Sequence, residues 1–211
     1  MHKILPLLTI CFALAALPAT ARTGEEIAKV FDSGVAAYDA GKHDEAFKIW
    51  WGLQYEDVAA MRNIAMMLRK GQGTTQDYRQ AREIYRRAAE AGLPTAQADL
   101  ADMLLKGEGG KPDPKAALPL LRAAANHPIA QFQLGQMYET GAGGLVPQNA
   151  EAARKLYAAA ASRGMKEASE RLSALPPAPP AATPDPTQGP IVIPDPPKLW
   201  VATARSLPIL G

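Results

Sequence analysis

The sequence predicts an all-α protein: an α-solenoid of stacked antiparallel helical hairpins with a Pro-rich C-terminal tail. Three observations support this fold class. Apolar residues recur at three- and four-residue spacing, which is the pattern of amphipathic helices. One pattern of helix, Gly-rich loop and helix returns about every 36 residues, as in helical repeat arrays. Ten of the 22 residues from Pro176 to Pro197 are proline, so this stretch cannot continue the helices.

Residues 1–21 are expected to be a secretory signal peptide. Lys3 adds positive charge ahead of an apolar run of about 14 residues, Ile4 to Leu17, which is too short to span a bilayer comfortably. Pro18 ends the run, and the small residues that follow place the cleavage after Ala21. The mature protein is therefore expected to be periplasmic or secreted, with an uncleaved membrane anchor as the alternative.

Composition narrows the class of protein further. The 211 residues carry a net charge of +2 and the basic residues are scattered, so no nucleic-acid partner is expected. Cys11 is the only cysteine and falls within the expected signal peptide. The mature chain is therefore expected to be held together by ordinary packing and not by disulfides.

Three copies of the helical hairpin align in register. In the second helix of each copy, alanines recur at an offset of 36 residues, where they are expected to let adjacent helices approach closely. The first helices match at offsets of 36 and then 34, and the loop after Gly141 restores the two missing residues. The aligned second-helix positions are Ala81, Tyr85, Ala88 and Ala89, then Ala117, Leu121, Ala124 and Ala125, then Ala153, Tyr157, Ala160 and Ala161.

A Gly-rich loop follows the first helix of each copy, with the sequences KGQGT at 70–74, KGEGG at 106–110 and TGAGG at 140–144. Such a loop before a helix can bind a phosphate. A phosphate loop would end in Lys-Ser or Lys-Thr, whereas Thr75 or Pro112 follows here. We therefore expect turns, in which glycine is the left-handed residue just past each helix and the lysine is solvated.

The apolar stripes give approximate helix bounds. First helices are expected over about 58–70, 95–106 and 129–140, and second helices over about 78–91, 114–126 and 149–163. A last helix over about 165–174 closes the array with a polar face. A related hairpin at about 24–54 starts at Thr23 and Glu26, which have capping-box spacing, and its loop is four residues shorter than the others.

These residues resemble the Sel-1-like repeat, a helical-hairpin relative of the tetratricopeptide repeat. In that family an A-x-x-LG-x-x-Y helix is followed by G-x-G, a loop Asp and a K-A-x-x-W-x-x-x-A-A helix. The segment AQFQLGQMYETGAGG at 130–144 matches the first half. Asp77 and Asp113 match the loop Asp, which Asn149 replaces in the third copy. The tryptophan position holds Ile84, Leu120 and Leu156.

The resemblance also gives the expected organisation of the chain. The signal peptide at 1–21 is followed by a tetratricopeptide-like helical hairpin at 22–57, three Sel-1-like repeats plus a capping helix at 58–175, a Pro-rich linker at 176–198 and an apolar C-terminal tail at 199–211. The resemblance implies that the protein is an adaptor and not an enzyme. It also implies a role in cell-envelope assembly, polysaccharide export or host interaction.

A partner-binding face is a further implication of the resemblance. In tetratricopeptide-like arrays the concave surface is lined mainly by the first helix of each hairpin. Its cations would form a mildly positive groove with apolar anchors, suited to an acidic or C-terminal peptide group, in a protein expected to be monomeric. A solvated, unused face is the alternative. Carried onto this chain position by position, the face comprises Tyr38, Arg62, Met66, Arg69, Asp102, Lys106, Phe132 and Gln136.

No catalytic, metal-binding or cofactor-binding site is expected. No HExxH, GxSxG or SxxK motif occurs in the sequence. His43 and His127 are expected to be exposed turn residues. Asp99 and Asp102 lie three residues apart on one helix, where they are expected to form a solvated face.

Tryptophans mark two further features. Trp50 is expected in the core of its hairpin, and Trp51 either half-buried against the next repeat or in a partner contact.

Large apolar residues recur in the tail at 199–211, after a Pro-rich linker that is expected to act as a spacer or as a ligand itself. We expect the tail to dock through Trp200, on its own solenoid when free and on a partner or membrane surface when bound. A functionless end is the alternative.

The expected function is a periplasmic scaffold that binds a peptide or protein partner, with membrane contact only through the tail. Two alternatives stay open. One is a binder or enzyme of cell-wall material, since some Sel-1-like proteins are linked to penicillin binding, although this chain lacks their cysteines and any nucleophile–base pair. The other is an immunity or inhibitor protein for a secreted toxin.

Overall fold

A computed structural model of the chain describes residues 22–176, which form the expected stack of helical hairpins. The first hairpin pairs α1 (Gly24–Asp39) with α2 (His43–Trp51). The next three pair α3 (Val58–Lys70) with α4 (Tyr78–Glu90), α5 (Pro94–Lys106) with α6 (Pro114–Ala123), and α7 (Pro128–Thr140) with α8 (Ala150–Ala161). A 3₁₀ turn, η1 (Gly141–Gly144), follows α7, and α9 (Lys166–Ala174) ends the array.

The expected signal peptide at 1–21 and the linker and tail residues from 177 to 211 lie outside the described residues. Within residues 22–176, no helix combines the length and the apolar character that crossing a membrane requires.

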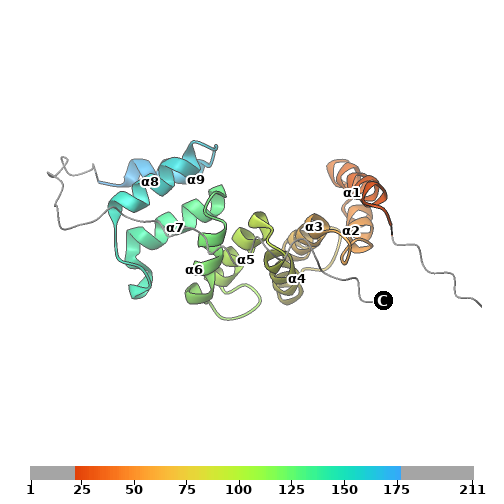
Figure 1. Cartoon of the computed structure of the whole chain (residues 1–211), viewed down its shortest axis with the longest axis horizontal. Coiled ribbons are helices and arrows are strands. Elements are labelled where there is room, and N and C mark those ends of the chain that lie inside the picture. The colour runs from red at the N-terminus through yellow and green to blue at the C-terminus, as the bar shows by residue number, and fades with distance from the viewer. Residues whose placement is uncertain (1–21, 177–211) are drawn as a thin grey trace, which may run out of the picture.

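The hairpins stand in a bowed row, with α1 and α2 at one end and α8 and α9 at the other (Figure 1). Each helix packs on the next along the chain, and α5 also contacts α7. In Figure 1, α3 and α5 lie toward the inside of the bow and α4 and α6 toward the outside. The first helices of successive hairpins therefore lie close enough for their side chains to meet across repeats.

Side chains cap the helices where the sequence pattern indicates. Thr23 and Glu26 form the expected capping box at the start of α1. The loop Asp of each repeat, Asp77 and Asp113, accepts a hydrogen bond from the third backbone N–H of the second helix, and Asn149 does the same for α8. The loop Asp is thus an N-cap, which explains why asparagine can replace it.

The Gly-rich loops are turns. Gly71, Gly107 and Gly141 end the three first helices with φ of 66°, 72° and 74°, the left-handed conformation that favours glycine. The backbone N–H of Asp77 then donates to the carbonyl of Leu68, which closes the loop onto the helix that precedes it.

The second glycine of each loop controls how closely neighbouring repeats approach. A Cβ on Gly73 would lie 2.2 Å from the carbonyl of His43 at the start of α2, and one on Gly109 would lie 2.5 Å from the carbonyl oxygen of Tyr78 at the start of α4. Each of these two loops therefore seats on the first turn of the second helix of the preceding hairpin. The third loop departs from this pattern, because a Cβ on Gly143 would meet no atom within 4 Å.

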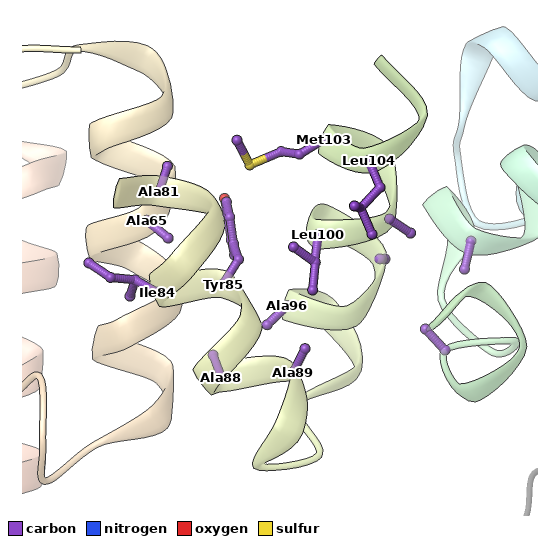
Figure 2. Close-up of a cluster of buried hydrophobic side chains, with 14 of the residues drawn as sticks. Ala65, Ala81, Ile84, Tyr85, Ala88, Ala89, Ala96, Leu100, Met103 and Leu104 are labelled. Carbon is purple, nitrogen blue, oxygen red and sulfur yellow. The ribbon is translucent and has the colours of Figure 1, made fainter. Parts of the chain in front are cut away.

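Small residues bring the helices together inside the core. Figure 2 shows the ring of Tyr85 standing between α4 and α5, beside Leu100, with Ala88, Ala89 and Ala96 below it between the same two helices. Tyr85 is fully buried, as are the three alanines. The expectation that alanines let adjacent helices approach closely is therefore confirmed.

The end of α6 differs most from its expected position, while the other helix bounds lie within two residues of theirs. The second helix expected to reach residue 126 ends at Ala123. Pro128 begins the next helix, and a residue before proline is disfavoured in the helical region. His127 accordingly adopts an extended backbone, with φ −90° and ψ 133°, so the turn between α6 and α7 is completed before it.

Gly109→Ala tests the contact between loops and preceding helices. The substitution places a side chain at positive φ, which costs about 1–2 kcal/mol, and drives it into α4, which adds about 1–3 kcal/mol. We expect a loss of roughly 2–5 kcal/mol in the free energy of unfolding, measured by urea denaturation.

Gly143→Ala is the matched control, because Gly143 also has positive φ but open space around it. It is expected to cost only the backbone term, about 1–2 kcal/mol. Equal losses for the two variants would show that the loop contact does not stabilise the array.

Candidate functional site

The residues expected to line the partner-binding face come from the first helices, and we call this surface the first-helix face. Tyr38 lies on α1, and Arg62, Met66 and Arg69 on α3. Asp102 and Lys106 lie on α5, and Phe132 and Gln136 on α7. The α3 and α5 residues meet in a network centred on Arg69 and in a neighbouring ion pair of Arg62, while Tyr38 and Phe132 pack locally at either side.

Arg69 is the centre of the network. Its Nε donates to Glu108 Oε2 at 2.5 Å, and its Nη2 donates to Asp102 Oδ2. Arg69 is only 18% exposed. Burial alone would lower the pKa of Arg69, but the bonds to Glu108 and Asp102 raise it above its usual value. The guanidinium therefore stays charged and joins the first helix of one repeat to the first helix and loop of the next.

Asp102 accepts from three sides. Besides Arg69, Lys106 Nζ donates to its Oδ2 at 2.9 Å, and Gln133 Nε2 on α7 donates to its Oδ1 at 2.6 Å. Burial opposes ionisation, but the hydrogen bonds from Lys106 and Arg69 outweigh it and lower the pKa of Asp102. One carboxylate thus holds α3, α5 and α7 in lateral register.

A second ion pair lies next to the first. Arg62 Nε donates to Asp99 Oδ2 at 2.9 Å, and Arg62 Nη1 lies 3.9 Å from Met66 Sδ. Asp99 is 7% exposed. Burial raises the pKa of the Tyr85 phenol above its usual value, and the nearby Asp99 carboxylate raises it further.

Two expectations about charge are therefore wrong. Asp99 and Asp102 do not form a solvated face, because repeat stacking buries Asp99 and half-buries Asp102 against arginines of the preceding repeat. The groove is not mildly cationic either, since Arg62, Arg69 and Lys106 are each paired with a carboxylate of this chain.

The outer members of the face have structural partners. Tyr38 donates through its hydroxyl to Gln72 Oε1 at 3.1 Å, and its ring centroid lies 5.8 Å from that of Trp50. Phe132 lies 5.6 Å, centroid to centroid, from Tyr157 of α8. Tyr38 and Phe132 remain half-buried, as does Gln136, so each still presents part of its side chain to solvent.

The histidines are less exposed than expected. His43 and His127 are both half-buried, and the Nδ1 atom of each is enclosed without a hydrogen-bond partner among the described residues. The loop at Gly73 covers His43, whose ring lies 4.7 Å, centroid to centroid, from Tyr38. Burial also lowers the pKa of His127 below its usual value.

Trp50 is in the core, as expected, at 2% exposure. Trp51 is half-buried and stacks on Phe47 of the same helix, with centroids 5.4 Å apart. The residues from 22 to 176 contain no group of three or more His, Cys, Asp or Glu side chains placed to hold a metal ion.

Sequence reasoning missed Glu108 and Gln133 as members of the network. Glu108 lies in the KGEGG loop, where the sequence pattern assigns roles to the glycines and the lysine alone. Gln133 is the third-repeat counterpart of Asp99, at an offset of 34 residues. Opposite charges separated by about one repeat, such as Arg69 and Glu108, 39 residues apart, are the signal that could have revealed Glu108, whereas the uncharged Gln133 gives no such signal.

Comparing Arg69→Met with Lys106→Met tests how much each donor of the network stabilises the fold, because both side chains donate to the same oxygen of Asp102. Arg69→Met leaves two half-buried carboxylates without their main partner and is expected to cost about 1–3 kcal/mol of unfolding free energy. Lys106 is 59% exposed, and its loss is expected to stay within about 0.5 kcal/mol. Urea denaturation at neutral pH measures both losses of unfolding free energy. Similar losses for the two variants would contradict a stabilising role for the half-buried Arg69.

Comparison with known proteins identifies the repeats. The family model described as Sel1 repeat matches residues 58–93, 94–127 and 128–165. Comparison with the curated proteins gives no match.

Two solved structures are similar over most of the chain. The crystal structure of a Sel1 repeat protein from Oxalobacter formigenes has 31% identity and a TM-score of 0.61, and the match covers 68% of this chain and 59% of that one. The crystal structure of c5321, described as a protective antigen present in uropathogenic Escherichia coli strains displaying an SLR fold, has 28% identity and a TM-score of 0.64.

The match to c5321 covers 70% of this chain and 33% of that one, so this chain spans only part of either relative. The three matched segments coincide with the hairpins α3–α4, α5–α6 and α7–α8. The chain belongs to the Sel1 repeat family.

Proposed function

We propose that this protein is a non-enzymatic interaction scaffold that binds a peptide or protein partner on its first-helix face. The observation that carries the proposal is the construction of that face. Ion pairs lock α3 and α5 in place, while Met66, Phe132 and Gln136 stand half-buried beside them. A rigid surface with partly exposed apolar groups can bind without having to order itself first, which lowers the cost of binding.

The partner we propose is a largely uncharged segment with apolar side chains. Arg62 and Arg69 already bind carboxylates of this chain, so an acidic peptide would have to displace Asp99 or Asp102. Displacement would leave a buried carboxylate without a partner, which is costly. Met66 and Phe132 offer apolar contact without that cost, and methionine adapts its shape to different side chains.

The hydroxyl groups support a protein that is not an enzyme. In the part of the chain that the structure describes, Ser33, Ser162, Ser169 and Ser173 each donate to a backbone carbonyl of the same helix or helix end. A catalytic serine would instead face a general base. Binding of a partner therefore fits these side chains better than acyl transfer does.

Photo-crosslinking tests the proposed face. A photoreactive phenylalanine analogue is placed at Met66 or Phe132 in the full chain, in the bacterium that makes it, and adducts are followed by a shift in mass. We expect the same adduct at both positions and several-fold less at Ala158, an exposed residue of α8 that serves as the control. Equal adduct yields at all three positions would refute binding on the first-helix face.

We also propose that the protein is exported, because the apolar run and the small residues that precede Arg22 have the pattern of a cleaved signal peptide. We expect the mature protein in the periplasmic fraction to begin at Arg22, because cleavage follows Ala21. Intact-mass spectrometry of the isolated protein measures this directly. A mass that retains Met1, or a lipid on Cys11, would contradict the proposed processing.

A further inference from the structure

A second surface lies on the side of the array away from the first-helix face. It is a shallow groove between α4 and α6, and Leu100 and Leu104 of α5 form its floor. Ala116, Pro119 and Leu120 of α6 line one wall, and Arg86 of α4 lines the other. Most of the groove is therefore apolar, and none of its residues belongs to the first-helix face.

The sequence of α6 explains why the groove is open. Ala116 and Pro119 are exposed on α6, so the wall carries small or compact side chains where longer ones would close the space. Pro119 also lies inside the helix, where it cannot donate a backbone hydrogen bond. Helix α6 ends early at Ala123, which shortens that wall.

The chain leaves the described array next to a second helix. The guanidinium of Arg154 on α8 donates to the carbonyl of Pro176, the last described residue. Helix α8 is the second helix of its hairpin, as are α4 and α6, which wall the groove. The chain after Pro176 therefore begins beside a second helix, and second helices also form the walls of the groove.

The linker is long enough to reach it. From α8 to α4 there are four helix-to-helix steps, or roughly 40 Å at about 10 Å for each packed pair. The 22 residues 177–198 would span up to about 70 Å if fully extended as polyproline II. Reach therefore does not limit a contact between residues 199–211 and the groove.

Residues 199–211 also have suitable chemistry. Six of them are large and apolar, namely Leu199, Trp200, Val201, Leu207, Ile209 and Leu210, and the segment contains no acidic residue. The groove offers leucine, proline and alanine surface, and its charged lining consists of Arg82, Arg86 and the exposed Glu90. A segment without acidic residues would therefore be held by apolar contact and not by charge.

We propose that residues 199–211 dock in the groove between α4 and α6 of the same chain, with Trp200 as the anchor on Leu100, Leu104 and Leu120. This contact leaves the first-helix face open. The tail therefore covers the apolar surface of the second helices while the partner site stays accessible.

Disulfide trapping tests this proposal in the full chain. With Cys11→Ser to remove the only cysteine, Ala116→Cys at the groove is combined with Ala202→Cys in the tail. The control combines Ala202→Cys with Ala158→Cys, which is exposed on α8 and nearer to the point where the chain leaves the array. We expect at least a five-fold higher yield of the intramolecular disulfide at Ala116 under mild oxidation, measured by peptide mass spectrometry.

Trp200→Asp then separates docking from chance encounter. The substitution lies outside the described helices, so helix content by circular dichroism is expected to stay unchanged while trapping at Ala116 falls to the control level. Photo-crosslinking at Met66 and Phe132 is expected to persist in this variant. Equal trapping at Ala116 and Ala158, no effect of Trp200→Asp, or disulfides formed only between two chains would each overturn the proposal.

Discussion

The close approach of the first two Gly-rich loops to the second helix of the preceding hairpin is the constraint on which the array depends. Gly73 and Gly109 place backbone against backbone at the starts of α2 and α4, where even a methyl group would overlap the neighbouring chain. Packing at this distance allows very few relative positions of two repeats. It therefore fixes the lateral register in which the first helices lie side by side.

That register determines the polar chemistry of the first-helix face. Arg62 reaches Asp99 across 37 residues, and Arg69 reaches Asp102 across 33, so the pairs lie on either side of the 36-residue repeat. A small shift of one repeat along another would separate both pairs at once. Because buried charges without partners are costly, the ion pairs in turn oppose such a shift.

Much of the fold could be predicted from the sequence because its determinants are local. In the three repeats from α3 to α8, a glycine at positive φ ends each first helix and Asp or Asn caps each second helix, so residues within a few positions of one another mark most of these helix bounds. Helix α6 ends three residues before the predicted position, because residues 124–126 form a tight turn closed by the bonds from Ala125 N to Arg122 O and from His127 N to Ala124 O.

The candidate site was harder to predict, because its contacts join residues of different repeats. The resemblance to tetratricopeptide-like arrays predicts that Arg62, Arg69, Asp102 and Lys106 share one face, but it contains no information on how far neighbouring helices are displaced sideways. Without that displacement, the arginines appeared free and the aspartates solvated. Glu108 enters from a loop, so no helical periodicity could have assigned it to the face.

The two long sides of the array differ in what their side chains leave available to a partner. On the first-helix face the charges are paired within the chain, so the proposed partner would gain little from long-range attraction and would be recognised by shape and apolar contact. Such binding should depend only weakly on ionic strength, because it would not rest on charges that salt screens. On the second-helix side, the small residues that let helices pack closely also leave Leu100 and Leu104 beneath a shallow groove. The same preference for alanine and glycine that brings the repeats together thus creates both a rigid polar face and an apolar surface opposite it.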